Sequence, residues 1–162
     1  MDDAGIKVIA TNRRAQRDYD IIGTYECGMV LRGSEVKSLR DGTVTIAEAY
    51  GKVASGEVWL HSMHVPPRPT VAAAFAPDPD RPRKLLLHRS EISRIKARVE
   101  QDRLLLIPLS LYFRDGRAKV EMALARRRRK VDRRTILARR EAELEARRAM
   151  SQAARTHDRD AR

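Results

Sequence analysis

The chain has 162 residues, a net charge of +12 and 42% hydrophobic residues, which indicates one folded domain of about 120 residues with an extension. Its single cysteine excludes an intramolecular disulfide, and no apolar run reaches the roughly 18 residues that a membrane-spanning helix needs. Aromatic residues make up only 4%, so base stacking is excluded as the main mode of binding a nucleic acid.

The amino-terminal third is expected to combine one long strand with a short helix. The first seven residues lack the basic patch and apolar run of a signal peptide, so a cytoplasmic protein is expected. Residues 21–31 are expected to form a strand, in which Gly23 and Gly28 mark bulges or sharp coiling. Ser34 is expected to cap a helix over residues 35–40.

The middle of the chain is expected to hold a hairpin, a long loop and a second helix. A turn around residues 54–57 is expected to join strands at 49–53 and 58–61. Residues 66–83 contain six of the seven prolines, so a long exposed loop is expected there. Ser90 is expected to cap a helix that runs to about residue 100.

Residues 104–114 form the clearest predicted strand, because apolar side chains recur at every second position. The Asp-Gly pair at 115–116 suits a hairpin turn, and a return strand follows it. Short strands joined by Gly-rich turns, with a few short helices, predict a mainly β protein built on a small closed barrel. One face of the first strand is expected to hold Leu105, Ile107, Leu109, Leu111 and Phe113, and one face of the return strand Val120, Met122 and Leu124.

The chain is expected to divide into a body, residues 1–125, and a basic tail, residues 126–162. The tail carries 14 of the 34 Lys and Arg residues with only six acids, so it holds +8 of the net charge. Helix-forming residues dominate the tail, but few large apolar side chains are available to dock on the body. We therefore expect the tail to be disordered when free and to become helical against a partner.

The densest basic run, residues 126–134, has seven cations and one anion. Like charge at this density repels itself unless a polyanion neutralises it, and nucleic acid is the common polyanion. The alternatives are a solvated charged end and a nucleolar-type address signal. Smaller basic clusters lie at residues 12–17 and 81–84, and Lys37 and Arg40 share one face of the predicted short helix. These features favour contact with RNA or DNA.

Residues for enzyme chemistry are scarce. His61 and His64 would point to opposite faces of an extended chain, and no third metal ligand accompanies them. Cys27 has no basic neighbour in sequence to lower its pKa, so burial is its expected role. No Gly-rich phosphate loop or serine motif is present. We expect no catalytic residue, no metal site and no cofactor.

Distinctive short blocks occur in order along the chain. Two of them are Glu-Val-Lys-Ser-Leu-Arg at 35–40 and Arg-Lys-Leu-Leu-Leu-His at 83–88. Others stand at 12–15, 18–19, 25–28, 108–112, 118–120 and 132–134. Together these blocks, which span about residues 8–140, resemble the SsrA-binding protein family, also called small protein B.

The resemblance implies a six-stranded barrel of oligonucleotide-binding type, whose ligand is transfer-messenger RNA, gripped at its tRNA-like domain. It also implies delivery of alanyl-transfer-messenger RNA, with elongation factor Tu, to ribosomes stalled on truncated messages. The tail would enter the vacant messenger channel of the small ribosomal subunit and fold as a helix near the decoding region. A monomer without a membrane partner is expected.

By position, Asn12, Glu26 and one leucine of the 85–87 run, taken as Leu87, match family residues tied to RNA binding. Lys37, Arg40 and Lys84 are added because of their charge. The complete RNA-binding set expected is Asn12, Arg13, Arg14, Tyr19, Glu26, Lys37, Arg40, Lys84 and Leu87. The tail residues expected to contact the ribosome are Arg126, Arg128, Arg129, Lys130, Asp132, Arg133 and Arg134.

The sequence departs from the family pattern in two places. Residues 127–129 are arginines where Gly-Lys-Lys is usual, and an arginine does not easily adopt the positive φ that glycine allows. Val131 stands where His or Tyr is usual. Because valine does not stack on a base, contact with the decoding centre would depend on charge instead.

The function expected from the sequence is a non-enzymatic RNA-binding adaptor for ribosome rescue and peptide tagging by trans-translation. Two alternatives stay open. One is a structural protein bound permanently to ribosomal RNA, which would share the basic arm. The other is a nuclease or RNA-modifying enzyme.

Overall fold

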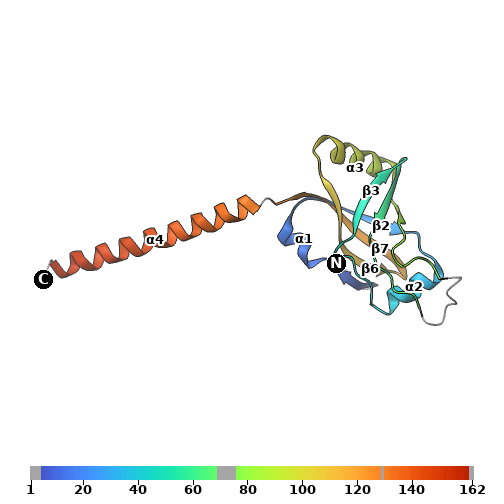
Figure 1. The fold of residues 1–162 in the computed structure, drawn as a ribbon, viewed down its shortest axis with the longest axis horizontal. Helices are drawn as coiled ribbons and strands as arrows, with labels where there is room; N and C mark the ends of the chain where they lie inside the picture. The colour runs from blue at the N-terminus through green and yellow to red at the C-terminus, as the bar shows by residue number, and fades with distance from the viewer. Residues whose placement is uncertain (1–4, 69–75, 129, 161–162) are drawn as a thin grey trace. The chain divides into compact units, whose positions relative to one another are not determined.

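The computed structural model describes residues 5–68, 76–128 and 130–160 (Figure 1). The chain divides into two compact units, Met1–Arg127 and Arg128–Arg162. The first unit is a strand-rich body, and the second is one helix, α4 (Lys130–Asp160). None of the helices formed by the described residues has the length and apolar character that a membrane span requires.

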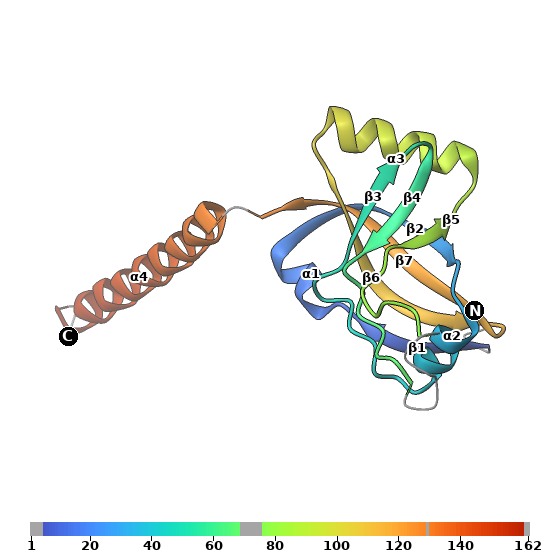
Figure 2. The same ribbon diagram turned by 45° about the vertical axis from the view of Figure 1, so that its right-hand side comes forward.

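The body is built on one antiparallel sheet that closes into a ring (Figures 1 and 2). The ring runs β6-β3-β4-β5-β2-β7 and closes from β7 back to β6, while β1 pairs with the second half of β6. The prediction of a mainly β barrel with a few helices is confirmed, and its assignment to the oligonucleotide-binding type stays a prediction. The strands are β1 (Ile6–Thr11), β2 (Tyr19–Met29), β3 (Tyr50–Ala54), β4 (Glu57–His61), β5 (Arg83–Leu86), β6 (Leu105–Arg114) and β7 (Arg117–Arg127).

The ring closes between β3 and β6, where Gly51 pairs with Leu106. A Cβ atom on Gly51 would lie 2.6 Å from Leu106 Cδ2 and 2.9 Å from Met122 Cε. Any larger residue at this position would therefore push both core side chains aside. Glycine allows the two strands to approach.

Strand β6 contains a bulge between Pro108 and Ser110, which leaves Leu109 without a partner on β7. An extra residue reverses the alternation of side chains beyond it. Leu104 and Leu106 before the bulge therefore share the barrel core with Leu111 and Phe113 after it. The predicted single face was wrong across the bulge: Leu105 is exposed, and Ile107 and Leu109 belong to a second, smaller apolar cluster outside the barrel. The predicted inward face of β7, with Val120, Met122 and Leu124, is confirmed.

Strand β2 begins and ends two residues before the predicted strand. Its register with β7 shifts between Ile21 and Gly23, so the bulge expected at Gly23 is confirmed. No register shift occurs at Gly28, which pairs with Lys119 on one side and Leu86 on the other. Of the two alternatives expected at Gly28, the bulge was wrong, and sharp coiling of the strand stays a prediction.

In the part of the body that the structure describes, three helices accompany the sheet: α1 (Arg13–Asp18), α2 (Gly33–Arg40) and α3 (Arg89–Gln101). The predicted caps, Ser34 and Ser90, were wrong, because both serines lie inside their helices. Helices α2 and α3 instead each have a glutamate in the first turn, whose carboxylate accepts a hydrogen bond from the backbone amide of the residue before the helix. Glu35 accepts from Arg32 at 2.9 Å and Glu91 accepts from His88 at 3.1 Å. Helix α3 lies at one end of the ring (Figure 2) and inserts the buried Ile95 into the core.

Helix α2 is joined to the loop before β5 by a buried ion cluster. The Glu35 carboxylate lies 2.7 Å from Arg83 Nη2 and also accepts a hydrogen bond from Arg81. Arg83 is completely buried and donates further hydrogen bonds to the backbone carbonyls of Met63 and Pro79. Burial opposes ionisation of Glu35, but the hydrogen bonds from Arg81, the Arg32 amide and Arg83 outweigh it and lower the pKa of Glu35.

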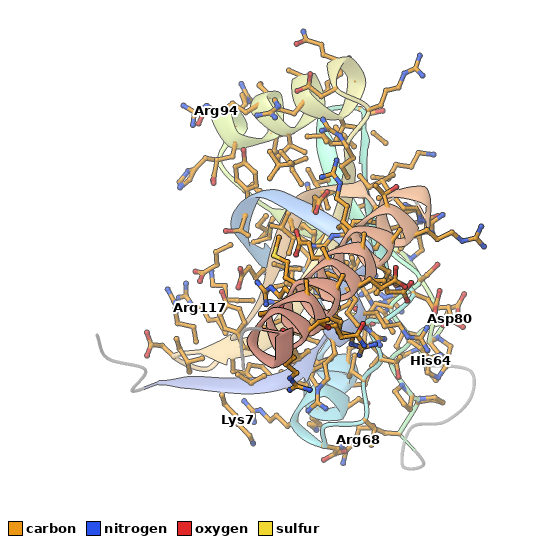
Figure 3. The ribbon with its side chains drawn as sticks, turned by 90° about the vertical axis from the view of Figure 1, so that its left-hand side faces the viewer. Lys7, His64, Arg68, Asp80, Arg94 and Arg117 are labelled. Carbon is orange, nitrogen blue, oxygen red and sulfur yellow. The ribbon has the colours of Figure 1, made fainter. Side chains whose placement is uncertain are left out.

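The same loop is closed from the solvent side by His64 and Asp80, whose side chains point toward one another with 2.8 Å between Nδ1 and Oδ1 (Figure 3). The described parts of the predicted proline-rich loop, residues 66–68 and 76–82, contain no helix or strand. The absence of a helix or strand is confirmed for these residues, but the prediction was wrong at Arg83, which begins β5 and pairs with Leu60 of β4. The base of the loop is therefore held by this polar side-chain contact together with backbone pairing of His64 with Thr45 and of Arg83 with Leu60.

Candidate nucleic-acid interface

Glu26 stands exposed on β2 and is held by two side chains from β6. The Tyr112 hydroxyl donates a hydrogen bond to Glu26 Oε2, and Arg114 Nη1 lies 3.2 Å from the same oxygen. Burial and this hydrogen bond raise the pKa of Tyr112, so the phenol stays protonated and remains the donor. The carboxylate is therefore fixed as an acceptor, which suits N–H groups of bases or a ribose 2′-hydroxyl.

Glu26 lines a surface cleft of about 500 Å³ together with Leu87. A second cleft of about 300 Å³ adjoins the first and shares Gly28, Leu86 and Lys119 with it. The two clefts form one hollow surface from the start of α3 to the turn between β6 and β7. The structure thus brings together two of the predicted RNA-binding residues, Glu26 and Leu87.

Cations border this surface. Lys119 lines both clefts, and Arg117 lines the second; Figure 3 shows Arg117 projecting outward from the body. Neither was among the predicted RNA-binding residues. The sequence did indicate that Lys119 and Arg117 face outward, because they alternate with the inward-facing Val120 along the predicted return strand. Tyr112 and Arg114 were also missed, since their contact with Glu26 spans more than 80 residues of sequence.

The predicted Arg40 lies close to the second cleft. Its guanidinium carbon is 5.9 Å from the ring centroid of Phe113, which lines that cleft. Lys37 is exposed on the same helix, α2. Both side chains are exposed and charged, and their contact with RNA stays a prediction.

Asn12 is buried, with only 7% of its surface exposed. Its Nδ2 donates to the Pro108 carbonyl at 2.9 Å, and its backbone amide donates to the Leu109 carbonyl at 2.8 Å. Both acceptors belong to the bulge of β6. Asn12, which lies between β1 and α1, thus ties this part of the chain to the bulge. An effect of Asn12 on RNA binding would therefore be indirect, through the position of α1.

Helix α1 and its surroundings form a second zone of predicted residues. Arg13 and Arg14 are exposed there, and Arg14 pairs with Glu48 at 3.3 Å. Tyr19 packs beneath Arg127, whose guanidinium carbon lies 6.0 Å from the ring centroid. Tyr19 and Glu26 are seven residues apart on β2, which corresponds to roughly 23 Å along the strand. Apart from Lys84, which lies on β5, the predicted set therefore divides into two zones toward the two ends of β2.

The basic cluster predicted at 81–84 contributes less free charge than its sequence suggests. Arg81 and Arg83 are committed to Glu35. Lys84 is half-exposed on β5 and pairs with Glu57 at 3.0 Å. Only Lys84 of this cluster presents its ammonium group to the outer surface of the sheet.

The tail residues fall partly outside the described part of the chain. Arg129 lies outside the described residues, as do the side chains of Lys130, Asp132 and Arg133. Arg126, Arg128 and Arg134 are exposed. Arg127 is an extended residue of β7 paired with Tyr19, so no positive φ is required of it. Over residues 134–156 every α4 side chain is exposed, including Ile136, Leu137, Leu144 and Met150.

Groups suited to catalysis are not assembled in the described residues. Cys27 is buried, as predicted, and burial, with Glu91 and Glu26 nearby, raises its pKa to about 12. A thiol with that pKa is protonated at neutral pH and is a poor nucleophile. Within residues 5–68, 76–128 and 130–160, no cluster of three or more His, Cys, Asp or Glu side chains could hold a metal ion.

Comparison with known proteins gives a consistent result. The family model described as SmpB protein matches residues 9–152. The chain is 51% identical over 146 residues to the SsrA-binding protein of Thermobifida fusca, covering 90% of this chain and 91% of that protein. It is 46% identical over 153 residues to the SsrA-binding protein of Frankia casuarinae, covering 94% and 96%. A solved structure described as "tmRNA-SmpB: a journey to the center of the bacterial ribosome" has 42% identity and a TM-score of 0.62, over 78% of this chain and 87% of that one.

Proposed function

The chain belongs to the SmpB protein family, and we propose that it is an RNA-binding adaptor, which binds transfer-messenger RNA and delivers it to stalled ribosomes for trans-translation. The observation that carries this proposal is the similarity, over nearly the whole chain, to proteins named for binding SsrA RNA. The cleft beside Glu26 supports it, since a fixed carboxylate flanked by Lys119 and Arg117 combines a base-edge acceptor with phosphate-binding cations.

The body and the tail have different tasks in this proposal. The body grips the folded RNA, with the two zones at the ends of β2 as its contacts. The tail contacts the decoding region and the messenger channel of the small ribosomal subunit. Its support is physical: α4 exposes its apolar residues and carries a basic start, so an RNA-walled channel would neutralise its charge.

The proposed function also includes a partner complex, a cellular compartment and an oligomeric state. The protein acts on the alanyl-transfer-messenger RNA complex with elongation factor Tu, as a cytoplasmic monomer. It carries out no chemistry itself, and the RNA supplies the tagging message. The protonated, buried Cys27 is consistent with a role limited to binding.

The direct test is capture of the tagged full-length protein from cells, followed by sequencing of the bound RNA. We expect one small structured RNA to dominate. Recovery of ribosomal RNA in ribosomal proportions, with the protein at one copy per ribosome in sucrose gradients, would instead identify a structural ribosomal protein. Cleavage or modification of purified RNA after prolonged incubation with the protein would identify an enzyme.

A further inference from the structure

The outward surface of β3, β4 and β5 gathers ring side chains and lysines, although the chain as a whole is poor in aromatics. Tyr50 and His61 are cross-strand partners, and their rings are stacked with centroids 5.3 Å apart and 10° between planes. Lys52 faces Trp59 two residues further along the hairpin, and Trp59 pairs with Lys84 on its other side. These five residues form the group that we call the aromatic platform.

The aromatic platform lies outside the barrel. Val58 and Leu60, which alternate with Trp59 and His61 along β4, are fully buried in the core. Side chains at alternate positions point to opposite faces of a strand. Tyr50 keeps 47% of its surface exposed, and Trp59 and His61 are half-buried. The free face of the Tyr50 ring is therefore open to a further planar group.

The lysines of the platform give it the charge that a nucleotide requires. Lys84 is paired with Glu57, whereas no carboxylate among the described residues lies within ion-pair distance of the Lys52 ammonium group. Lys52 is exposed beside the ring of Trp59. An aromatic surface with an adjacent free cation is the arrangement that binds unpaired nucleotides, because the ring takes the base and the cation takes the phosphate.

The platform is continuous with the clefts beside Glu26. Leu86, which is 51% exposed, lies two residues beyond Lys84 on β5 and lines both clefts. From the pairing of Trp59 with Lys84 and of Gly28 with Leu86, Trp59 lies roughly 16 Å from Glu26 across the sheet. One RNA strand could span this distance.

We propose that the aromatic platform is a second RNA contact, which stacks one unpaired base on Tyr50, beside Trp59, and holds the adjoining phosphate on Lys52. This inference rests on the proposed function, because the RNA bound at the Glu26 cleft supplies the unpaired nucleotide. The contact takes RNA by stacking and charge, without hydrogen bonds to base edges. It is therefore tolerant of base identity.

Trp59 is the only tryptophan of the chain, so its fluorescence reports on the platform in the full-length protein. The probe is a single-stranded hexa-adenylate, and its anionic control is inorganic polyphosphate at equal charge. We expect saturable quenching of Trp59 by hexa-adenylate and little quenching by polyphosphate. Equal quenching by the two probes, or none by either, overturns the proposal.

Two pairs of variants test whether the ring and the lysine contribute to hexa-adenylate binding directly. Each pair includes a control that distinguishes this contribution from a loss of folding. Tyr50→Leu removes the ring and is expected to weaken hexa-adenylate binding about 5-fold or more, whereas Tyr50→Phe should retain it. Lys52→Ala should weaken binding and flatten its salt dependence, while Lys7→Ala, an exposed lysine on β1, should not. Far-ultraviolet circular dichroism checks that each variant is folded. Equal affinities for Tyr50→Leu and Tyr50→Phe contradict a stacking role.

A gel-shift titration with folded transfer-messenger RNA distinguishes this inference from the proposed function. If the wild type binds the folded RNA while Trp59 does not respond to hexa-adenylate, the aromatic platform is not an RNA contact and the proposed function stands. If the wild type does not bind the folded RNA, the proposed function fails, whatever the oligonucleotide does.

Discussion

The side-chain amide of Asn12 donates a hydrogen bond to the Pro108 carbonyl, 2.9 Å away and 96 residues further along the chain. The contact fixes the end of β1 against the bulge in β6, and α1 starts at the next residue. A residue matched by position to RNA binding is thus placed by the structure in the scaffold under an exposed basic helix. That distinction has measurable consequences.

Replacing Asn12 by alanine should lower the free energy of unfolding by about 1–3 kcal/mol, because the buried Pro108 carbonyl loses its donor. Urea denaturation of the full-length protein measures the loss. Gln16→Ala, on the exposed surface of α1, is the control and should change stability by less than about 0.5 kcal/mol. Unchanged stability together with lost RNA affinity would mean that Asn12 touches the RNA directly.

Replacing Tyr112 by phenylalanine should weaken binding of transfer-messenger RNA several-fold, because Glu26 loses a hydrogen-bond donor and is held by Arg114 alone. The cost in stability should be about 1 kcal/mol, as for one hydrogen bond. Filter-binding titrations measure the affinity. Tyr25→Phe removes a hydroxyl from the strand that carries Glu26 and should leave affinity unchanged; a loss as large as that of Tyr112→Phe would remove the specific role of Tyr112.

Acid should destabilise the body through Glu35. The pKa of this carboxyl is lowered in the folded protein, so its contribution to stability is complete above its unfolded pKa of about 4.5 and is lost as the pH falls through the folded value. Glu35→Gln should cost about 3 kcal/mol at pH 7, since Arg83 is left buried without its counter-charge, and should reduce the slope of stability against pH below about pH 5. Chemical denaturation at several pH values measures both, and an unchanged acid slope would contradict the assignment.

An isolated peptide of residues 128–162 should contain little helix in dilute buffer. Its like charges repel one another, and the exposed Leu144 and Met150 find no apolar surface to pack against. Addition of an RNA polyanion should raise the helical circular dichroism signal strongly, because neutralisation removes the repulsion. A peptide that is fully helical without RNA would contradict the expectation that the tail is disordered when free.

Patterns within short stretches of sequence predicted the barrel, the hairpins and the core face of β7. The predicted side-chain faces were wrong where one extra residue interrupts the alternation. This happens at Leu109, where the bulge reverses which side chains of β6 point into the core. The predicted helix starts were wrong because Ser34 and Ser90 are common capping residues, whereas the hydrogen bonds at these two starts are accepted by Glu35 and Glu91. Both glutamates stand in the sequence at the position that a capping box requires.

Two residues that line the clefts could be predicted from the sequence, but the contacts that hold Glu26 could not. Glu26 and Leu87 came from the resemblance, but the contact of Glu26 with Tyr112 depends on strand order and register, which local patterns do not fix. The same holds for Tyr50 and His61: each is ordinary in its own strand, and only the register of the β3–β4 hairpin stacks the two rings.

The most direct test of the division between body and tail is truncation after Arg127 in a reconstituted translation system with ribosomes stalled on a truncated message. The cut must follow Arg127, because Ala125 is buried and residues up to Arg127 pair with β2. We expect residues 1–127 to bind transfer-messenger RNA with nearly the affinity of the full chain and to support no peptide tagging. Tagging at the full-length rate by residues 1–127 would contradict this expectation.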